Sequence, residues 1–243
     1  MSKALATAKA GNYEAALAIW GPLAHQGVAR AQSNIGACFS GGLGVRRDAA
    51  MAIRWLTLAA EAGDPVGQRN LATAYFKGEG VAGDGARAAA LYRMAADQGD
   101  AQAQDMLSWM LVEGEMIATD HAEARRLAEA AAAQGVAASM TRLGMIYHNA
   151  LGVERDPAAA ARWWERAAVR GDADAQAMLG AAIHVGAGVS RDALAAFAWL
   201  LRAKAGGSKL ADLFIDAAQA ALTSAQRAEA RRLAEVPLSE EVA

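Results

Sequence analysis

Histidine, aspartate and glycine residues in this sequence have the chemistry that catalytic or nucleotide-binding sites use. The segment GEGVAG, residues 78–83, matches the G-x-G-x-x-G pattern that binds dinucleotides when it follows a strand and opens a helix. His148 and His184 lie 36 residues apart, and each is a candidate general base. A carboxylate such as that of Asp105 or Asp174 would be needed beside them. Whether any of these groups forms a site depends on the elements that position them.

A period of 36 residues runs through the chain and sets the context of every candidate. Glycine closes an alanine-rich segment once per period, at Gly27, Gly63, Gly99, Gly135, Gly171 and Gly207. Alanine recurs in the same register at Ala52, Ala88, Ala124, Ala160 and Ala196, and again seven residues later in each period. Such a period is the signature of a repeat protein. We therefore expect one domain, 1–243, with a partial repeat 1–27, repeats 28–63, 64–99, 100–135, 136–171 and 172–207, a C-terminal helix and cap 208–234, and a tail 235–243.

Each repeat is predicted to form two helices, as the segment 64–99 illustrates. Asp64 is a helix N-cap, and apolar residues follow at helical spacing until about Lys77. A second N-cap, Asp84, opens another helix that Gly99 closes in left-handed geometry. The recurrent alanines lie on one helix face and allow neighbouring helices to approach closely. The predicted fold class is all-α, an α/α superhelix, or solenoid, of five 36-residue helix-turn-helix repeats with terminal helices.

The glycine motif is then a turn between two helices. GEGVAG has counterparts in GLGVRRD (42–48), LGVERD (151–156) and GAGVSRD (186–192), whereas a phosphate site is needed only once per protein. The glycines permit positive φ in a tight connection, and the aspartate caps the next helix. We therefore expect no nucleotide site and no other cofactor.

The histidines and the cysteine fit structural roles. Cys38 shares its register with Ala74, Met110, Ile146 and Ala182, so it is predicted to be a buried, inert thiol. His25 and His121 read as isolated surface residues, and no metal site is expected. Large apolar side chains at Trp55, Leu91, Leu127, Trp163 and Trp199 share another register and are predicted to fill the core.

Composition and charge narrow the possible environments and partners. The net charge of −2 gives no attraction for nucleic acid, and no apolar run is long enough to span or insert into a membrane. The N-terminus has no apolar core of a signal peptide. A single cysteine fits a reducing compartment, so a cytoplasmic location is expected, and a periplasmic one stays open if a leader has been removed.

The repeat pattern resembles the Sel-one-like repeat (SLR) family, a relative of the tetratricopeptide repeat. The clearest copies are residues 140–171 and 31–63, and the resemblance covers about residues 12–221. It implies a non-enzymatic scaffold or adaptor, mostly bacterial, that binds a peptide or protein segment in a concave groove. Residues 11–27 resemble the lone second helix that opens such arrays, and 223–234 resemble a terminal cap helix.

The related repeat lines its groove with the first helix of each pair. Carried over by register, this implies partner-binding candidates at Arg30, Arg69, Phe76, Asp105, Trp109, Arg142, Met145, His148, Asn149 and His184. Trp109 is the sharpest candidate, because an indole on such a surface is a typical peptide anchor. Repeat 100–135, however, has GEM (114–116) where the others carry a second glycine. Local packing of Trp109 in an irregular repeat is therefore an equal alternative.

Three further possibilities stay open from the sequence. An exported regulator of the same type would use the same scaffold. An enzyme would require His148 or His184 to meet Asp105 or Asp174, although the sequence has no G-x-S-x-G, H-E-x-x-H, Walker or C-x-x-C motif. The chain could also form a homo-oligomer through its ends.

Overall fold

The computed structural model describes residues 1–238, and within this range all regular secondary structure is helical. The last five residues of the predicted tail, 239–243, lie outside the described residues. The chain falls into two compact units, Met1–Thr119 and the part that begins at Asp120. The boundary between them lies in the turn of the third repeat, the one that departs from the glycine pattern.

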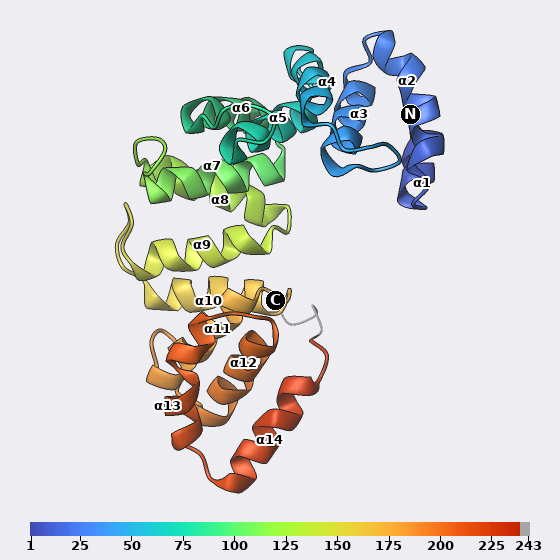
Figure 1. Cartoon of the computed structure of the whole chain (residues 1–243). Helices are drawn as coiled ribbons and strands as arrows, with labels where there is room; N and C mark the ends of the chain where they lie inside the picture. Colours follow the sequence, from blue (N-terminus) through green and yellow to red (C-terminus); the bar gives the residue numbers. More distant parts are fainter. Residues whose placement is uncertain (239–243) are drawn as a thin grey trace. The chain divides into compact units, whose positions relative to one another are not determined.

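The first unit consists of helices that pack in chain order. They are α1 (Ser2–Lys9), α2 (Tyr13–His25), α3 (Ala29–Gly41), α4 (Ala49–Glu61), α5 (Pro65–Lys77), α6 (Gly85–Asp97) and α7 (Ala101–Glu113). Within a repeat the two helices pair, α3 with α4 and α5 with α6, and consecutive repeats meet through α4 and α5 (Figure 1). Helix α3 also contacts α5, so first helices of neighbouring repeats lie side by side.

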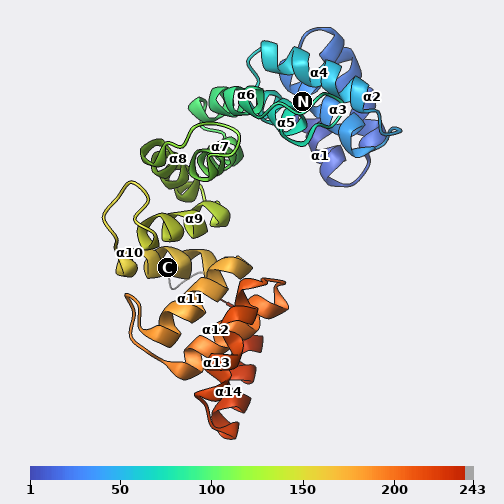
Figure 2. The same ribbon diagram turned by 60° about the vertical axis from the view of Figure 1, so that its left-hand side comes forward.

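The second unit continues the same alternation. It contains α8 (His121–Ala133), α9 (Ala137–His148), α10 (Pro157–Ala168), α11 (Ala173–Val185), α12 (Ala193–Ala205), a short 3-10 helix η1 (Leu210–Leu213), α13 (Ile215–Ala220) and α14 (Ser224–Glu235). Helices α9 and α10 pair, as do α11 and α12, and α14 packs against α12 (Figure 2). In the described range, none of the helices is both long and apolar enough to cross a membrane.

Aspartate side chains cap most of the repeat helices, as predicted, whereas Val28 and Val136 precede α3 and α9 without a side-chain cap. The carboxylate of Asp84 accepts a hydrogen bond from the Arg87 amide at 2.9 Å, and that of Asp64 from the Gly67 amide at 2.8 Å. Equivalent caps are made by Asp48, Asp100, Asp120, Asp156, Asp172 and Asp192. Each cap satisfies an amide that has no partner within its own helix. These carboxylates are therefore structural, and the prediction that they are caps is confirmed.

Glycines in the first helices make room for large side chains of the second helices. A β-carbon built on Gly36 would lie 2.7 Å from Cγ of Leu56, and one on Gly180 would lie 2.9 Å from Cγ of Leu200. On Gly144 the β-carbon would overlap Nε1 of Trp164. The paired helices thus nest because a small residue on one faces a large residue on the other.

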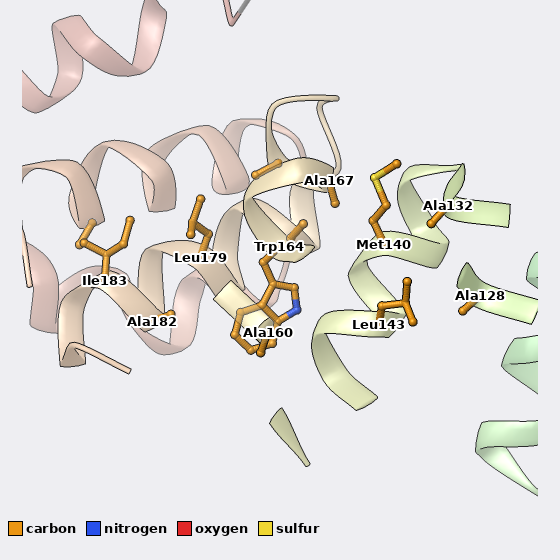
Figure 3. Packing of buried hydrophobic residues seen from close by; sticks show 13 residues of the cluster. Ala128, Ala132, Met140, Leu143, Ala160, Trp164, Ala167, Leu179, Ala182 and Ile183 are labelled. Carbon is orange, nitrogen blue, oxygen red and sulfur yellow. The ribbon is translucent and has the colours of Figure 1, made fainter. Parts of the chain in front are cut away.

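The core column lies one residue later than the sequence suggested. Of the predicted column only Leu127 is buried, while Trp55, Leu91, Trp163 and Trp199 are half-buried. The fully buried column is Leu56, Tyr92, Ala128, Trp164 and Leu200. In four of these helices the residue four positions beyond this column is buried as well, at Ala60, Ala96, Ala132 and Ala168, so the buried face is centred one residue later than predicted. Figure 3 shows Trp164 of α10 lying between Leu179 of α11 and Leu143 of α9.

The turn of the third repeat differs from the others, as the sequence indicated. In the other repeats the second glycine of the turn, at Gly44, Gly80, Gly152 and Gly188, has a positive φ of 66 to 75°. Met116 stands in this register, and among the described residues Ala150 is the only non-glycine with positive φ. The chain at Met116 therefore follows a different path through the turn.

The two ends differ in detail from the prediction. Helix α1 packs against α2, so α2 is not a lone opening helix. The segment expected to form one helix after repeat 172–207 is broken into η1 and α13. Helix α14 begins with a capping box in which Thr223 and Gln226 satisfy each other's backbone amides. Nη2 of Arg202 donates to the carbonyls of Leu233 and Val236 at 2.5 and 2.6 Å, which fixes the end of α14 on α12.

Candidate partner-binding surfaces

Two arginines predicted to bind a partner are tied to the cap of the next repeat. Nε of Arg30 donates to Oδ1 of Asp64 at 2.7 Å. Nη1 of Arg69 donates to both carboxylate oxygens of Asp100 at 3.0 and 3.3 Å. Each aspartate caps a helix at the same time, so one carboxylate joins two consecutive repeats. The charges of these two arginines are therefore compensated within the first unit.

Phe76 of α5 and Trp109 of α7 meet on the first-helix surface of unit 1. Their ring centroids are 5.6 Å apart and the planes are inclined at 80°, an edge-to-face contact. Both side chains are half-buried, so part of each ring faces solvent. The indole thus packs locally, as one of the two alternatives predicted, and its role as a peptide anchor stays a prediction. The pair forms an apolar contact between two neighbouring repeats.

Asp105 and Arg142 do not offer free charges to a partner. Asp105 is buried, with 8% of its surface exposed, and Arg142 is half-buried. Each takes part in a polar interaction within the described chain. The carboxylate of Asp105 is therefore part of the packed interior and not of an open surface, since a charged group is buried only when it is compensated.

The remaining candidates lie in the second unit. Met145 is 39% exposed, Asn149 is exposed, and His184 is half-buried. The ring of His148 packs on Trp164 with centroids 5.4 Å apart and planes at 50°. Neither histidine belongs to a group of three or more potential metal ligands among residues 1–238. His148 is therefore positioned by an aromatic neighbour.

An apolar cavity of about 170 Å³ opens beside His148. Its wall is made by His148, Trp164, Met178, Ala181, Ala182, Val185, Ala187 and Phe214. Nδ1 of His148 and Nε1 of Trp164 are buried and make no hydrogen bond within the described chain. The cavity was not predicted, although the small residue Ala181 in the register of Trp109 is a sequence signal for it.

The cysteine is a packing residue. Cys38 is 2% exposed and unpaired, and burial raises the pKa of its thiol. A raised pKa leaves less thiolate at neutral pH, and the thiolate is the nucleophilic form. The prediction of a buried thiol is confirmed.

Buried glutamines join consecutive repeats, a role that the sequence analysis missed. Nε2 of Gln32 donates to the carbonyl of Ala24 at 3.1 Å, and Nε2 of Gln176 to that of Ala168 at 3.0 Å. Gln68 and Gln104 make the same bond to Ala60 and Ala96. The signal was visible as a glutamine at constant register inside an apolar stripe.

Arginines of the turns satisfy the ends of the first helices, a second role that was missed. Nε of Arg47 donates to the carbonyl of Ser40 at 3.0 Å, and those of Arg155 and Arg191 donate to His148 and His184 at 3.1 Å. Helix C-termini leave carbonyls without partners, and a basic side chain is a suitable donor. The recurrent Arg-Asp pair therefore closes one helix and opens the next.

The geometry thus offers apolar contact areas on first helices, at the Phe76–Trp109 pair and at the cavity beside His148. Comparison with known proteins gives a consistent picture. The model of the Sel1 repeat matches five consecutive segments, residues 29–64, 65–100, 101–136, 137–172 and 173–208. The comparison with curated proteins gave no match.

Two solved structures illustrate the likeness. A Sel1 repeat protein from Oxalobacter formigenes has 27% sequence identity and a TM-score of 0.85, covering 98% of this chain and 97% of that one. A Sel1 repeat protein from Klebsiella pneumoniae has 21% identity and a TM-score of 0.53, covering 84% of this chain and 99% of that one. The second likeness concerns the fold alone.

Proposed function

This chain belongs to the Sel1 repeat family, and on that premise we propose that it is a non-enzymatic scaffold that binds a peptide or protein segment on its first helices. The observation that carries the proposal is the half-buried Phe76–Trp109 pair, which presents two aromatic rings from neighbouring repeats. Aromatic side chains dominate the energetics of protein interfaces because they bury a large area with few rotatable bonds. Adjacent repeats hold them at a fixed spacing.

The surroundings of the pair suit an extended segment. The ion pairs of Arg30 and Arg69 with the caps compensate the arginine charges, so a partner does not need to bring matching carboxylates. The hydroxyl of Thr73, on the same helix as Phe76, bonds to Tyr92 and to its own helix backbone. Contact with the rings is therefore the main source of affinity in this proposal.

Site-specific cross-linking tests the proposed surface. A photoreactive benzoylphenylalanine replaces Phe76 in one form of the full chain and Met94 in another, and both are irradiated in lysate of the native host. Met94 is the matched control because it is an exposed apolar residue on a second helix, 49% accessible. Mass spectrometry of the adducts should identify one partner segment from position 76 only. Equal adducts at both positions, or none at position 76, would reject the surface.

The proposal includes a cytoplasmic location. It is supported by the single, unpaired cysteine, since exported proteins more often contain disulfides. Fractionation of the native host tests it. Recovery of the protein from the periplasm would favour the alternative of an exported regulator with the same binding surface.

A further inference from the structure

The register of the repeats relates the cavity in the second unit to the aromatic pair in the first. His148 stands 72 residues after Phe76, and Ala181 stands 72 residues after Trp109, which is two full periods in both cases. In unit 1 the indole of Trp109 packs edge to face on Phe76. In unit 2 the counterparts His148 and Ala181 are two walls of the 170 Å³ cavity. The cavity therefore occupies the place that the equivalent repeat fills with an indole.

We propose that this cavity is a binding pocket for one aromatic side chain of the partner, an indole or phenyl ring that packs against His148 as Trp109 packs against Phe76. The inference rests on the proposed function, because it assigns the ring to the bound partner segment. It adds the chemical class of the anchor and the residues that receive it.

The size and polarity of the cavity favour an aromatic ring. A cavity of about 150 Å³ with apolar walls is enough for benzene in another protein, so a single ring fits in about 170 Å³. Apart from His148, the side chains lining the cavity are apolar, and none is an acid, a lysine or an arginine. The thioether of Met178 and the ring of Phe214 are favourable neighbours for an aromatic edge.

One wall residue, His148, has a polar atom without a partner, because its Nδ1 is buried and makes no hydrogen bond within the described chain. Nε1 of Trp164 does not face the cavity, since it lies against Gly144 of α9, where a β-carbon would overlap it. We therefore expect a bound ring to be held by apolar packing. Val185, 61% exposed, stands where a partner would enter.

Titration with free indole tests the pocket in the full chain without knowledge of the partner. The chain has four histidines, so the ring protons of His148 can be followed individually by NMR. Indole should shift the His148 signals through its ring current, in a saturable way, while those of His25 and His121, which do not line the cavity, change little. The absence of a saturable shift at His148 would overturn the proposal. This experiment needs no substitution and so does not depend on the folding of any variant.

A filling variant checks the location. Ala181→Trp places in repeat 172–207 the residue that repeat 100–135 carries naturally, and it should weaken indole binding at His148 at least 10-fold. Met94→Trp is the control, because Met94 is exposed on the second helix α6 of unit 1 and does not line the cavity. It should leave the affinity within twofold. Equal weakening by both variants would contradict the assignment of the pocket.

The two proposals fail separately. Binding of indole at His148 together with loss of every adduct at position 76 would reject the proposed function but keep the pocket. Specific adducts at position 76 without a saturable shift at His148 would keep the scaffold and reject the aromatic pocket.

Discussion

Met116 lies against Gly85 so closely that a β-carbon built on the glycine would be 2.7 Å from Cβ of Met116. In the other turns the roles are reversed. The glycines Gly44, Gly80, Gly152 and Gly188 approach Tyr13, Ala49, His121 and Pro157, the residues in the register of Gly85. Each of these contacts between a turn and the first residue of the preceding second helix thus contains one glycine. At the turn of the third repeat the helix carries the glycine, at Gly85, whereas in the other repeats the turn carries it.

The exchange predicts a coupling between residues 85 and 116. Gly85→Ala should destabilise the protein by about 1–3 kcal/mol, the usual cost of overpacking, less a gain of up to about 1 kcal/mol from replacing glycine in a helix. In a Met116→Gly background the same substitution should cost close to nothing, because the clash is absent. Urea denaturation of the wild type, the two single variants and the double variant measures the coupling free energy between the two positions. Equal costs of Gly85→Ala in both backgrounds would mean that the contact is not a constraint.

Gly144 is predicted to be intolerant of a methyl group. Gly144→Ala would drive a β-carbon into Nε1 of Trp164, and the buried indole cannot move without displacing the core, so a loss of at least about 1–3 kcal/mol is expected. Gly21→Ala is the control, because Gly21 lies inside α2 and a β-carbon there would meet no other atom within 4 Å. That variant should be neutral or more stable. Thermal unfolding of both distinguishes steric exclusion from helix propensity.

The aspartates that join consecutive repeats should contribute more to the free energy of unfolding as helix caps than as ion-pair partners. Asp100→Ala removes both the cap to the Ala103 amide and the pair with Arg69, and should cost about 1–2 kcal/mol. Asp100→Asn keeps a capping oxygen and should cost less than about 1 kcal/mol. Arg69→Met removes only the pair and leaves the carboxylate bonded to the Ala103 amide, so it should cost less than Asp100→Ala. Chemical denaturation at low and moderate salt compares them. A loss of stability in Arg69→Met as large as that in Asp100→Ala would contradict this ranking.

Tyr92 should make stability fall above pH 10. Burial raises the pKa of Tyr92, against smaller opposing effects of the Thr73 hydrogen bond and of Arg69. Between its ordinary pKa of about 10 and the higher folded value, the unfolded chain binds fewer protons than the folded one. The contribution of the Tyr92 phenol to the free energy of unfolding is therefore fully present below pH 10, and it is lost as the pH rises through the pKa of the folded state.

Tyr92→Phe isolates this effect. At pH 8 the variant should be less stable by about 1 kcal/mol, because the 2.9 Å hydrogen bond to Thr73 is lost. At pH 11 the difference should shrink, since the variant has no phenol to ionise. Paired denaturation curves at the two pH values provide the measurement. A difference that grows with pH would have the wrong sign.

The fold was readable from the sequence because its constraints are local and repeated. Asp84 and Gly99 fix the ends of a helix through backbone chemistry that needs only neighbouring residues. The core column was misplaced by one residue because Trp55 and Leu56 lie on either side of the same alanine stripe. The choice between them depends on the packing of the adjacent first helix, where Gly36 leaves room for Leu56.

The candidate surfaces were predicted less completely, because exposure depends on partners far along the chain. Register alone placed Phe76 and Trp109 on neighbouring first helices, and the structure brings them into contact. The register could not show that Asp105 is buried. The cavity at Ala181 includes Phe214, which comes from the irregular segment after the last repeat, where the period no longer sets positions.

Binding of the partner segment to variants of the full chain is the most direct test of the central claim. The segment cross-linked at position 76 would be synthesised and titrated calorimetrically into the wild type, Trp109→Ala and Met94→Ala. We expect Trp109→Ala to weaken the affinity about 30-fold or more, the effect of a hot-spot residue worth about 2 kcal/mol, while the affinity of Met94→Ala stays within about twofold of the wild type. Affinity for Trp109→Ala equal to that of the wild type would contradict it.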